Sequence, residues 1–247
     1  MDWAKQFYKE QFLLINQQDE VASAYLQEDV DRIEEQFGKA FQTVLELGAG
    51  DGQLANMMAQ RGKDVTTVEF VEERVAYAKS QAQVPMTILC GDFYTIDVSE
   101  QFDCVLYIDG FGVGEDADQL RLLHRVHHWL KDDGYALIDI YEPNYWQAAY
   151  KEPMLPTNDE KVYRQYSYDF ENNRFIDEWW HQDHEDAKVA QSLKCYSIKE
   201  IAALCEQANL SIVGYFPGGA VDYEQWTYTE PAALDHCISY RIKLKKK

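Results

Sequence analysis

A short apolar run that ends in three glycines constrains the fold of this chain more than any other feature. Residues 44–52 read Val-Leu-Glu-Leu-Gly-Ala-Gly-Asp-Gly, and apolar residues at helical spacing follow from Gln53. The pattern predicts a buried parallel strand, a sharp turn at Gly48, Gly50 and Gly52, and then a helix. Glycine lets the chain bend there and lets a ligand approach a backbone that a Cβ would block. The segment predicts a nucleotide-type cofactor site, and an ordinary strand-to-helix turn is the simpler alternative.

The spacing of the glycines narrows the class of cofactor. A dinucleotide-binding fingerprint needs Gly-x-Gly-x-x-Gly, but the third glycine comes one residue early and Gln53 stands in its place. A P-loop is excluded because no Gly-Lys-Ser/Thr ending follows. The acidic-x-Gly-x-Gly-x-Gly pattern from Glu46 to Gly52 instead resembles motif I of class I S-adenosylmethionine-dependent methyltransferases, of the small-molecule type.

Two further carboxylates strengthen this resemblance. Glu69 closes a second apolar run and Asp92 follows a third, at equal steps along the chain from Glu46. We therefore expect the three acids along one edge of a parallel sheet, where open α/β sheets bind their ligands. The resemblance implies that Glu69 accepts both ribose hydroxyls and that Asp92 and Phe93 hold and stack on the adenine. A carboxylate suits a diol because it accepts two charge-assisted hydrogen bonds.

The remaining core repeats strand and helix. A helix is expected from about residue 118 to 130, a turn at Asp133-Gly134, and a late helix that opens with a capping box at Ser197. We predict an α/β fold with a doubly wound, seven-stranded, mostly parallel sheet of the Rossmann-like methyltransferase type. Beyond the first three strands, the expected strands are 102–108, 135–141, 210–216 and 237–244.

We expect a single methyltransferase domain over residues 1–247. Its parts are a helical leader or lid (1–40), a cofactor-binding core (41–142), a substrate-side insertion (143–195) and a C-terminal helix and strand pair that completes the sheet (196–247). The resemblance implies a leader that folds over the cofactor with Tyr8 pointing inward, whereas a merely packed amphipathic helix is the alternative.

The insertion contains a predicted antiparallel aromatic hairpin. Aromatic residues alternate with polar ones before the turn 171–174, and a second strand runs from Phe175 to Trp180. The hairpin is either a lid over the substrate or a flap that only packs. The candidate substrate residues are Tyr8, Tyr166, Trp179, Trp180 and His181.

A methyl group on a sulfonium already carries its leaving group, so alignment and exclusion of water come first and a general base is optional. Asp109, Tyr141 and Glu142, which follow the fourth and fifth strands, are the candidate catalytic residues. No metal is expected, since the pair His124 and His128 lacks the Glu of His-Glu-x-x-His. The candidate cofactor-binding residues are Glu46, Gly48, Ala49, Gly50, Gly52, Glu69, Phe70, Asp92, Phe93, Asp109 and Gly110.

Charge and composition limit the partners. The 247 residues carry a formal net charge of −20, which repels phosphate backbones and disfavours nucleic acid. We expect a small neutral or cationic methyl acceptor, no membrane contact and a cytoplasmic protein, as a monomer or homodimer. The five scattered cysteines should be free thiols, with Cys90 and Cys104 in core strands. An aminopropyltransferase-like enzyme and a non-catalytic cofactor-binding partner protein are the alternative functions, and O- or N-methylation stays open.

Overall fold

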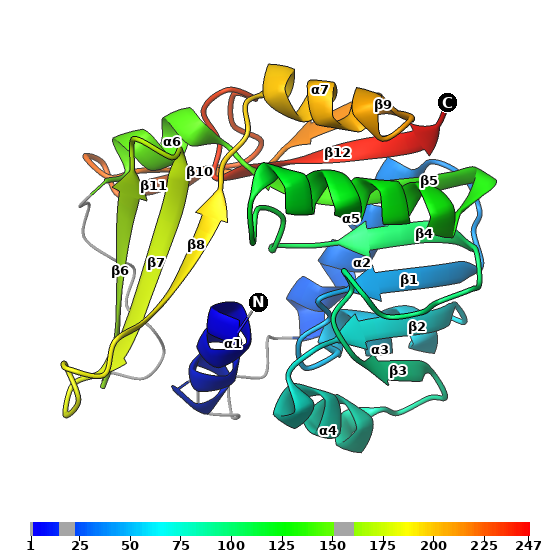
Figure 1. Ribbon diagram of the computed structural model, residues 1–247, viewed down its shortest axis with the longest axis horizontal. Coiled ribbons are helices and arrows are strands. Elements are labelled where there is room, and N and C mark those ends of the chain that lie inside the picture. Colours follow the sequence, from blue (N-terminus) through cyan, green and yellow to red (C-terminus); the bar gives the residue numbers. More distant parts are fainter. Residues whose placement is uncertain (1, 15–22, 151–160) are drawn as a thin grey trace.

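A seven-stranded sheet forms the centre of the protein in the computed structural model, which describes residues 2–14, 23–150 and 161–247 (Figure 1). Its strands are β1 (Thr43–Leu47), β2 (Asp64–Glu69), β3 (Thr87–Cys90), β4 (Phe102–Tyr107), β5 (Leu130–Tyr141), β9 (Leu210–Pro217) and β12 (Ser239–Lys246). The strand order is β3-β2-β1-β4-β5-β12-β9. β12 runs antiparallel to both of its neighbours, and the pairs among β1 to β5 are parallel. The predicted fold class is confirmed.

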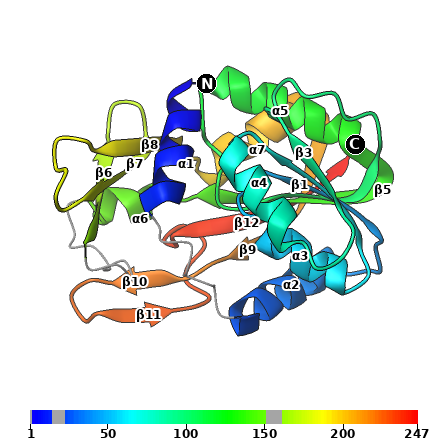
Figure 2. The ribbon, with the colours of Figure 1, turned by 90° about the horizontal axis from the view of Figure 1, so that it is seen from below.

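Helices cover both faces of this sheet (Figure 2). α2 (Ser23–Phe37) and α3 (Gln53–Gln60) pack on one face, and α5 (Asp116–Trp129) and α7 (Ile198–Gln207) pack on the other. α4 (Glu72–Gln81) packs against β2 and β3. Burial on both faces explains why β1 reads as an almost unbroken apolar run.

The direction of chain winding reverses between β1 and β4, which are hydrogen-bonded neighbours although β2 and β3 lie between them in sequence. In open α/β sheets the crevice outside the carboxyl ends of such a pair is where ligands bind. The fold therefore brings the segment after Leu47 and the segment after Tyr107 together at one edge.

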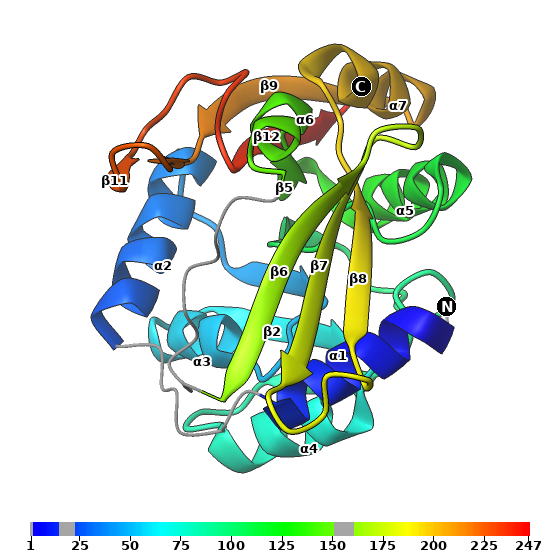
Figure 3. The ribbon, with the colours of Figure 1, turned by 90° about the vertical axis from the view of Figure 1, so that its left-hand side faces the viewer.

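A second, antiparallel sheet stands beyond that edge (Figure 3). It consists of β6 (Val162–Asp169), β7 (Arg174–His181) and β8 (Val189–Lys194), and we call it the acceptor-side sheet. α6 (Pro143–Ala148) connects β5 toward it, and a short hairpin of β10 (Ala220–Asp222) and β11 (Thr227–Thr229) follows β9. The predicted aromatic hairpin is confirmed as β6 and β7, whereas β8 was not predicted.

α1 (Asp2–Leu14) lies between the acceptor-side sheet and the main sheet, and it packs against β7, β8 and α4 (Figure 1). Phe7 is buried on this helix against Val162 and Trp179. Residues 15–22 of the predicted leader and 151–160 of the predicted insertion lie outside the described residues. No helix in the described part of the chain is long and apolar enough to cross a membrane.

Several local expectations are corrected by the structure. Asp133-Gly134 is not a turn between elements: β5 begins at Leu130, and an irregularity in its pairing with β4 absorbs these residues. The last strand extends beyond the predicted residue 244, because Lys245 and Lys246 pair with β9 inside β12. All five cysteines are free, as predicted, but Cys90 is exposed because β3 is the edge strand of the sheet.

Candidate active site

The glycine turn, residues 48–52, has the sharp geometry that the sequence predicts. Gly48, Gly50 and Gly52 all have positive φ, and the Gly48 amide donates to the Val68 carbonyl at 2.8 Å, which fixes the turn to β2. A Cβ at Gly52 would lie 3.0 Å from the Cβ of Ala78, so a larger residue has no room there. The turn opens at the carboxyl ends of β1 and β4, where the fold predicts a ligand.

Glu69 is the acid most closely joined to this turn. It is 5% exposed, and its two carboxylate oxygens accept hydrogen bonds from the amides of Gly50 (2.9 Å) and Val71 (2.8 Å). Burial raises the pKa of the carboxyl, and these amides oppose the rise. Each oxygen can accept a further bond, so the group remains able to bind a hydroxyl.

Glu46 is buried behind the turn and has an unsatisfied oxygen. Its Oε2 atom has no hydrogen-bond partner, and burial, followed by repulsion from Asp51 and Glu69, raises its pKa to about 8. A buried carboxylate without a partner is costly. A bound ammonium group would supply the missing donor and favour the charged form. The residues present therefore fit a cofactor with an amino-acid end.

The three acids do not lie level along the edge. Glu46 is opposite Thr67 and Glu69 is opposite Cys90, so Glu69 lies two residues further along the sheet than Glu46. Asp92 lies two residues beyond Cys90 and accepts the Tyr94 amide at 2.8 Å. The acids therefore step outward, as is needed to follow an extended ligand.

Asp109 follows β4 at the opposite wall of the crevice. Its backbone is left-handed (φ 55°), its side chain keeps solvent access, and its carboxylate accepts a hydrogen bond from the Tyr141 hydroxyl. Burial among surrounding protein atoms raises its pKa to about 6, although the Tyr141 bond lowers it. A strained, accessible carboxylate with a raised pKa is a frequent feature of active sites.

Tyr8 reaches both walls of the crevice from α1. Its hydroxyl donates to Gln191 at 2.9 Å, and its carbonyl accepts from Arg74 at 3.2 Å. Its ring packs edge-on against Phe70, which follows Glu69, with centroids 6.0 Å apart. The inward direction that the resemblance implied for Tyr8 is what the structure shows.

A buried polar network covers the inner face of the acceptor-side sheet. Asp177 is 0% exposed and makes a bidentate pair with Arg164, at 2.7 and 2.8 Å. Its Oδ2 atom also accepts from Trp179 and Gln191, each at 2.9 Å. The Arg164 guanidinium lies 4.7 Å from the ring centre of Tyr166. The sequence alone did not indicate roles for Arg164, Asp177 and Gln191. Polar and charged residues that alternate along a strand usually lie on a solvent-exposed face.

Arg174 ties the same sheet to the loop after Asp109. Its guanidinium is buried and donates to the carbonyls of Gly112 (3.1 Å), Gly114 (2.9 Å) and Ser192 (2.7 Å). A Cβ at Gly112 would lie 2.4 Å from the Lys194 carbonyl, so the loop and β8 meet at van der Waals distance. The loop after Asp109 and the acceptor-side sheet are therefore firmly attached to each other.

Trp179 and Trp180, both candidate substrate residues, lie in different surroundings in the structure. Trp179 is buried beneath Phe7 and donates its indole N–H to Asp177, whereas Trp180 stacks on exposed Tyr163, with centroids 5.8 Å apart. Strand alternation puts these neighbours on opposite faces, so Trp180 does not line the site. His181 lies 3.6 Å from Asp183, and its ring centre is 6.0 Å from that of His184.

Glu142 has a structural role at the start of α6. It is the N-cap of α6, where its carboxylate accepts from the Tyr145 amide at 2.8 Å and from Asn144 at 3.0 Å. Burial raises its pKa to about 7. Both of its oxygens thus hold the start of α6, and the catalytic role expected of Glu142 stays a prediction.

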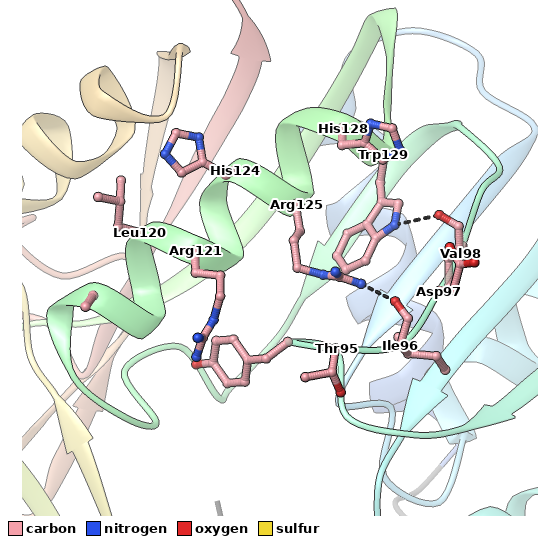
Figure 4. A pocket seen from close by; sticks show the side chains of 12 residues that line it. Thr95, Ile96, Asp97, Val98, Leu120, Arg121, His124, Arg125, His128 and Trp129 are labelled. Carbon is pink, nitrogen blue, oxygen red and sulfur yellow. Dashed lines mark hydrogen bonds between the residues drawn. The ribbon is translucent and has the colours of Figure 1, made fainter.

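A cavity of about 690 Å³ lies apart from this site, between α5 and the segment after Asp92 (Figure 4). Arg125 donates there to the Ile96 carbonyl, and His124 and His128 stand on successive turns of α5. None of the residues that line it belongs to the glycine turn or the acceptor-side sheet. Among the described residues no group of three or more His, Cys, Asp or Glu side chains could hold a metal ion.

Comparison with known proteins agrees with this geometry. A family model described as "Methyltransferase domain" matches residues 44–134. A putative methyltransferase of Geobacillus sp. (strain WCH70) is 26% identical over 126 residues, which is 48% of this chain and 50% of that protein. A ubiquinone biosynthesis O-methyltransferase of Pseudomonas paraeruginosa is 32% identical over 103 residues, covering 39% of this chain and 44% of that one. The chain spans about half the length of the first curated relatives it matches.

Among solved structures, an S-adenosylmethionine-dependent methyltransferase from Clostridium acetobutylicum superimposes with a TM-score of 0.71 at 15% identity, over 92% of this chain and 93% of that one. The main sheet, with the glycine turn after β1, therefore has the fold of S-adenosylmethionine-dependent methyltransferases.

Proposed function

We propose that the protein transfers a methyl group from S-adenosylmethionine to an oxygen or nitrogen atom of a small-molecule acceptor by in-line displacement. The observation that carries the proposal is the unsatisfied, buried carboxylate of Glu46 behind a turn of three left-handed glycines at the winding reversal of the sheet. When bound, the cofactor supplies a methyl group on a sulfonium that already carries its leaving group. A curated relative over part of the chain is named as an O-methyltransferase of ubiquinone biosynthesis, which also supports a small acceptor.

Each cofactor-side residue would bind a different chemical group of the ligand. Glu46 would accept the ammonium group, and Glu69 would accept the ribose hydroxyls with its remaining lone pairs. The Phe93 ring lies beside the turn, since its Cε1 atom is 4.0 Å from a Cβ built on Gly48. Phe93 and Asp92 would frame the adenine. The backbone of Ala49, Gly50 and Gly110 would complete the surface that this ligand contacts.

The acceptor-side residues handle the nucleophile. As a carboxylate, Asp109 would take the proton of an acceptor O–H or N–H group, while the Tyr141 hydroxyl holds that carboxylate in place. The rings of Tyr8 and Tyr166 and the α1 helix would exclude water from the reacting atoms. The net charge of −20 favours a neutral or cationic acceptor over a polyanion.

Two alternatives make different demands on these residues. An aminopropyl transfer uses a decarboxylated cofactor, which has no carboxylate for Arg74, whose Nη1 atom lies 3.3 Å from a Cβ built on Gly50. A non-catalytic cofactor-binding protein has no need of an accessible carboxylate at Asp109. We therefore favour methyl transfer, and tighter binding of S-adenosylmethionine than of its decarboxylated form would support that choice.

The proposal is tested by calorimetric titration of S-adenosylmethionine into the wild-type protein and two variants. Glu69→Ala should weaken binding by about 2 kcal/mol or more, because the diol loses a charged acceptor. Glu72→Ala removes an exposed carboxylate at the start of α4 and should leave the affinity unchanged. Equal affinities for Glu69→Ala and wild type would remove Glu69 from the cofactor site.

A further inference from the structure

Tyr8 of α1 contacts both walls of the crevice. Tyr8 bonds to the acceptor-side sheet through its hydroxyl and to α4 through its carbonyl. We infer that Tyr8 is a positioning residue that transmits cofactor occupancy at the glycine turn to the acceptor-side sheet. The inference rests on the proposed function, because it requires the cofactor to bind at that turn.

The cofactor-side end of this link is Arg74. Its Nε atom donates to the Tyr8 carbonyl and its Nη2 atom donates to Gln11, at 3.0 Å, while the Phe12 ring lies 5.2 Å away. Nη1 is the remaining end, and it lies within 3.3 Å of a Cβ built on Gly50. Arg74 forms no salt bridge within the described part of the chain. A carboxylate that arrives at the turn would therefore find an arginine whose other two nitrogens already hold α1.

The acceptor-side end of the link is a chain of buried hydrogen bonds. The Tyr8 hydroxyl donates to the Gln191 carbonyl oxygen, and the Gln191 amide donates to Asp177. Asp177 in turn holds the Arg164 guanidinium and the Trp179 indole. Gln191 is 6% exposed and Asp177 is 0% exposed, so water cannot readily replace a lost partner. Displacement of Tyr8 would therefore disturb the inner face of β7 and β8.

This arrangement gives Tyr8 two separable roles. Its ring packs against Phe7 and Phe70, at centroid distances of 5.1 and 6.0 Å, and its hydroxyl makes the hydrogen bond to the acceptor-side sheet. Tyr8→Phe keeps the ring and removes the hydroxyl. If Tyr8 only packed, this variant would behave as the wild type. If it transmits occupancy, the variant would bind the cofactor and fail to order the sheet.

The test is hydrogen–deuterium exchange of the full chain with and without saturating S-adenosylhomocysteine, the demethylated cofactor. In the wild type, binding should slow amide exchange at least about fivefold in residues 48–52, in α1, and also in β7 and β8. In Tyr8→Phe the slowing should persist at residues 48–52 and disappear from β7 and β8. Calorimetry should show an S-adenosylhomocysteine Kd within about threefold of wild type, although loss of the buried bond to Gln191 should lower the free energy of unfolding.

Two further variants sharpen this experiment. Tyr163→Phe makes the same substitution on the outer face of the same sheet, where the residue is exposed and stacks on Trp180, and should keep the wild-type exchange pattern. Gln191→Met removes the middle of the link and should reproduce the loss in β7 and β8 seen with Tyr8→Phe.

Slowed exchange of β7 and β8 in Tyr8→Phe equal to that in the wild type would overturn the inference. A wild-type sheet whose exchange ignores S-adenosylhomocysteine, although calorimetry shows the ligand bound, would overturn it as well. Failure of the wild type to bind S-adenosylhomocysteine would instead overturn the proposed function, so the two failures are distinguishable.

Discussion

The two walls of the crevice are built in different ways. The cofactor-side wall consists of short segments that directly follow β1, β2 and β3, and it presents backbone amides and strand-end carboxylates such as Glu69. The acceptor-side wall collects Tyr8, Asp109, Arg164, Asp177 and Gln191 from distant parts of the chain, and it presents side chains joined by buried hydrogen bonds.

This difference determines what a substitution should cost. At the cofactor-side wall the geometry is local, so a change should reduce ligand affinity more than stability. At the acceptor-side wall the polar groups are buried and share partners, so a change should reduce stability before it reveals any effect on an acceptor. Such a separation is expected when binding groups are placed on a rigid scaffold and a second layer encloses them.

The largest effect that we predict concerns the two neighbouring tryptophans of β7. Trp179→Ala should lower the free energy of unfolding by about 3–5 kcal/mol, because it empties a buried site beneath Phe7 and removes a donor to Asp177. Trp180→Ala, on the outer face, should cost less than about 1 kcal/mol. Denaturant unfolding measures both, and equal losses would contradict the assignment of the two side chains to opposite faces.

A glycine pair provides the matching comparison at the other wall. Gly50→Val should reduce S-adenosylhomocysteine affinity at least about 100-fold, or about 2.7 kcal/mol, because the branched side chain enters the space beside Arg74. Gly62→Val imposes the same left-handed strain (φ +83°) where nothing lies within 4 Å, and it should leave affinity unchanged. Calorimetry of both variants separates backbone strain from blockage of the site. Similar affinity losses in the two would mean that strain alone is responsible.

A smaller effect is expected from pH. The pKa of Asp109 is raised to about 6 chiefly by burial, so lowering the pH through 6 protonates it and removes a proton acceptor. With an identified methyl acceptor, kcat/KM should increase about tenfold for each unit that the pH is raised toward 6, and it should level off above pH 6. Asp109→Asn should abolish this dependence. A wild-type profile that is flat between pH 5 and 7 would show that Asp109 is not the base.

The same contrast explains how much the sequence could reveal. The glycine turn and the acids at 46, 69 and 92 follow their own strands directly, so local pattern and spacing place them at one edge. The capping box at Ser197 is equally local, and the structure confirms it. The centre of the sheet was predictable because β1 and β4 are buried, mostly apolar runs.

The acceptor-side wall was less accessible to prediction. Charged residues on a strand usually indicate a solvent-exposed face. Arg164 and Asp177 instead face inward and neutralise one another. Gln191 lies on β8, a strand without a strong apolar alternation. Arg74 lies on a helix, and its sequence gives no sign that the folded chain places its side chain beside Gly50. These roles depend on pairings across long stretches of sequence, which periodicity does not encode.

The central claim is that the turn and its acids bind the amino-acid end of S-adenosylmethionine, and proton linkage tests it most directly. With a pKa of about 8, Glu46 is mostly protonated at pH 7 in the free protein, and pairing with the ligand's ammonium group should drive its proton off. We therefore predict that calorimetry of S-adenosylhomocysteine binding at pH 7, in two buffers of different ionisation enthalpy, shows release of roughly one proton. Glu46→Gln should abolish that release. Binding without proton release in the wild type, or release that persists in Glu46→Gln, would contradict the assignment of Glu46 to the cofactor site.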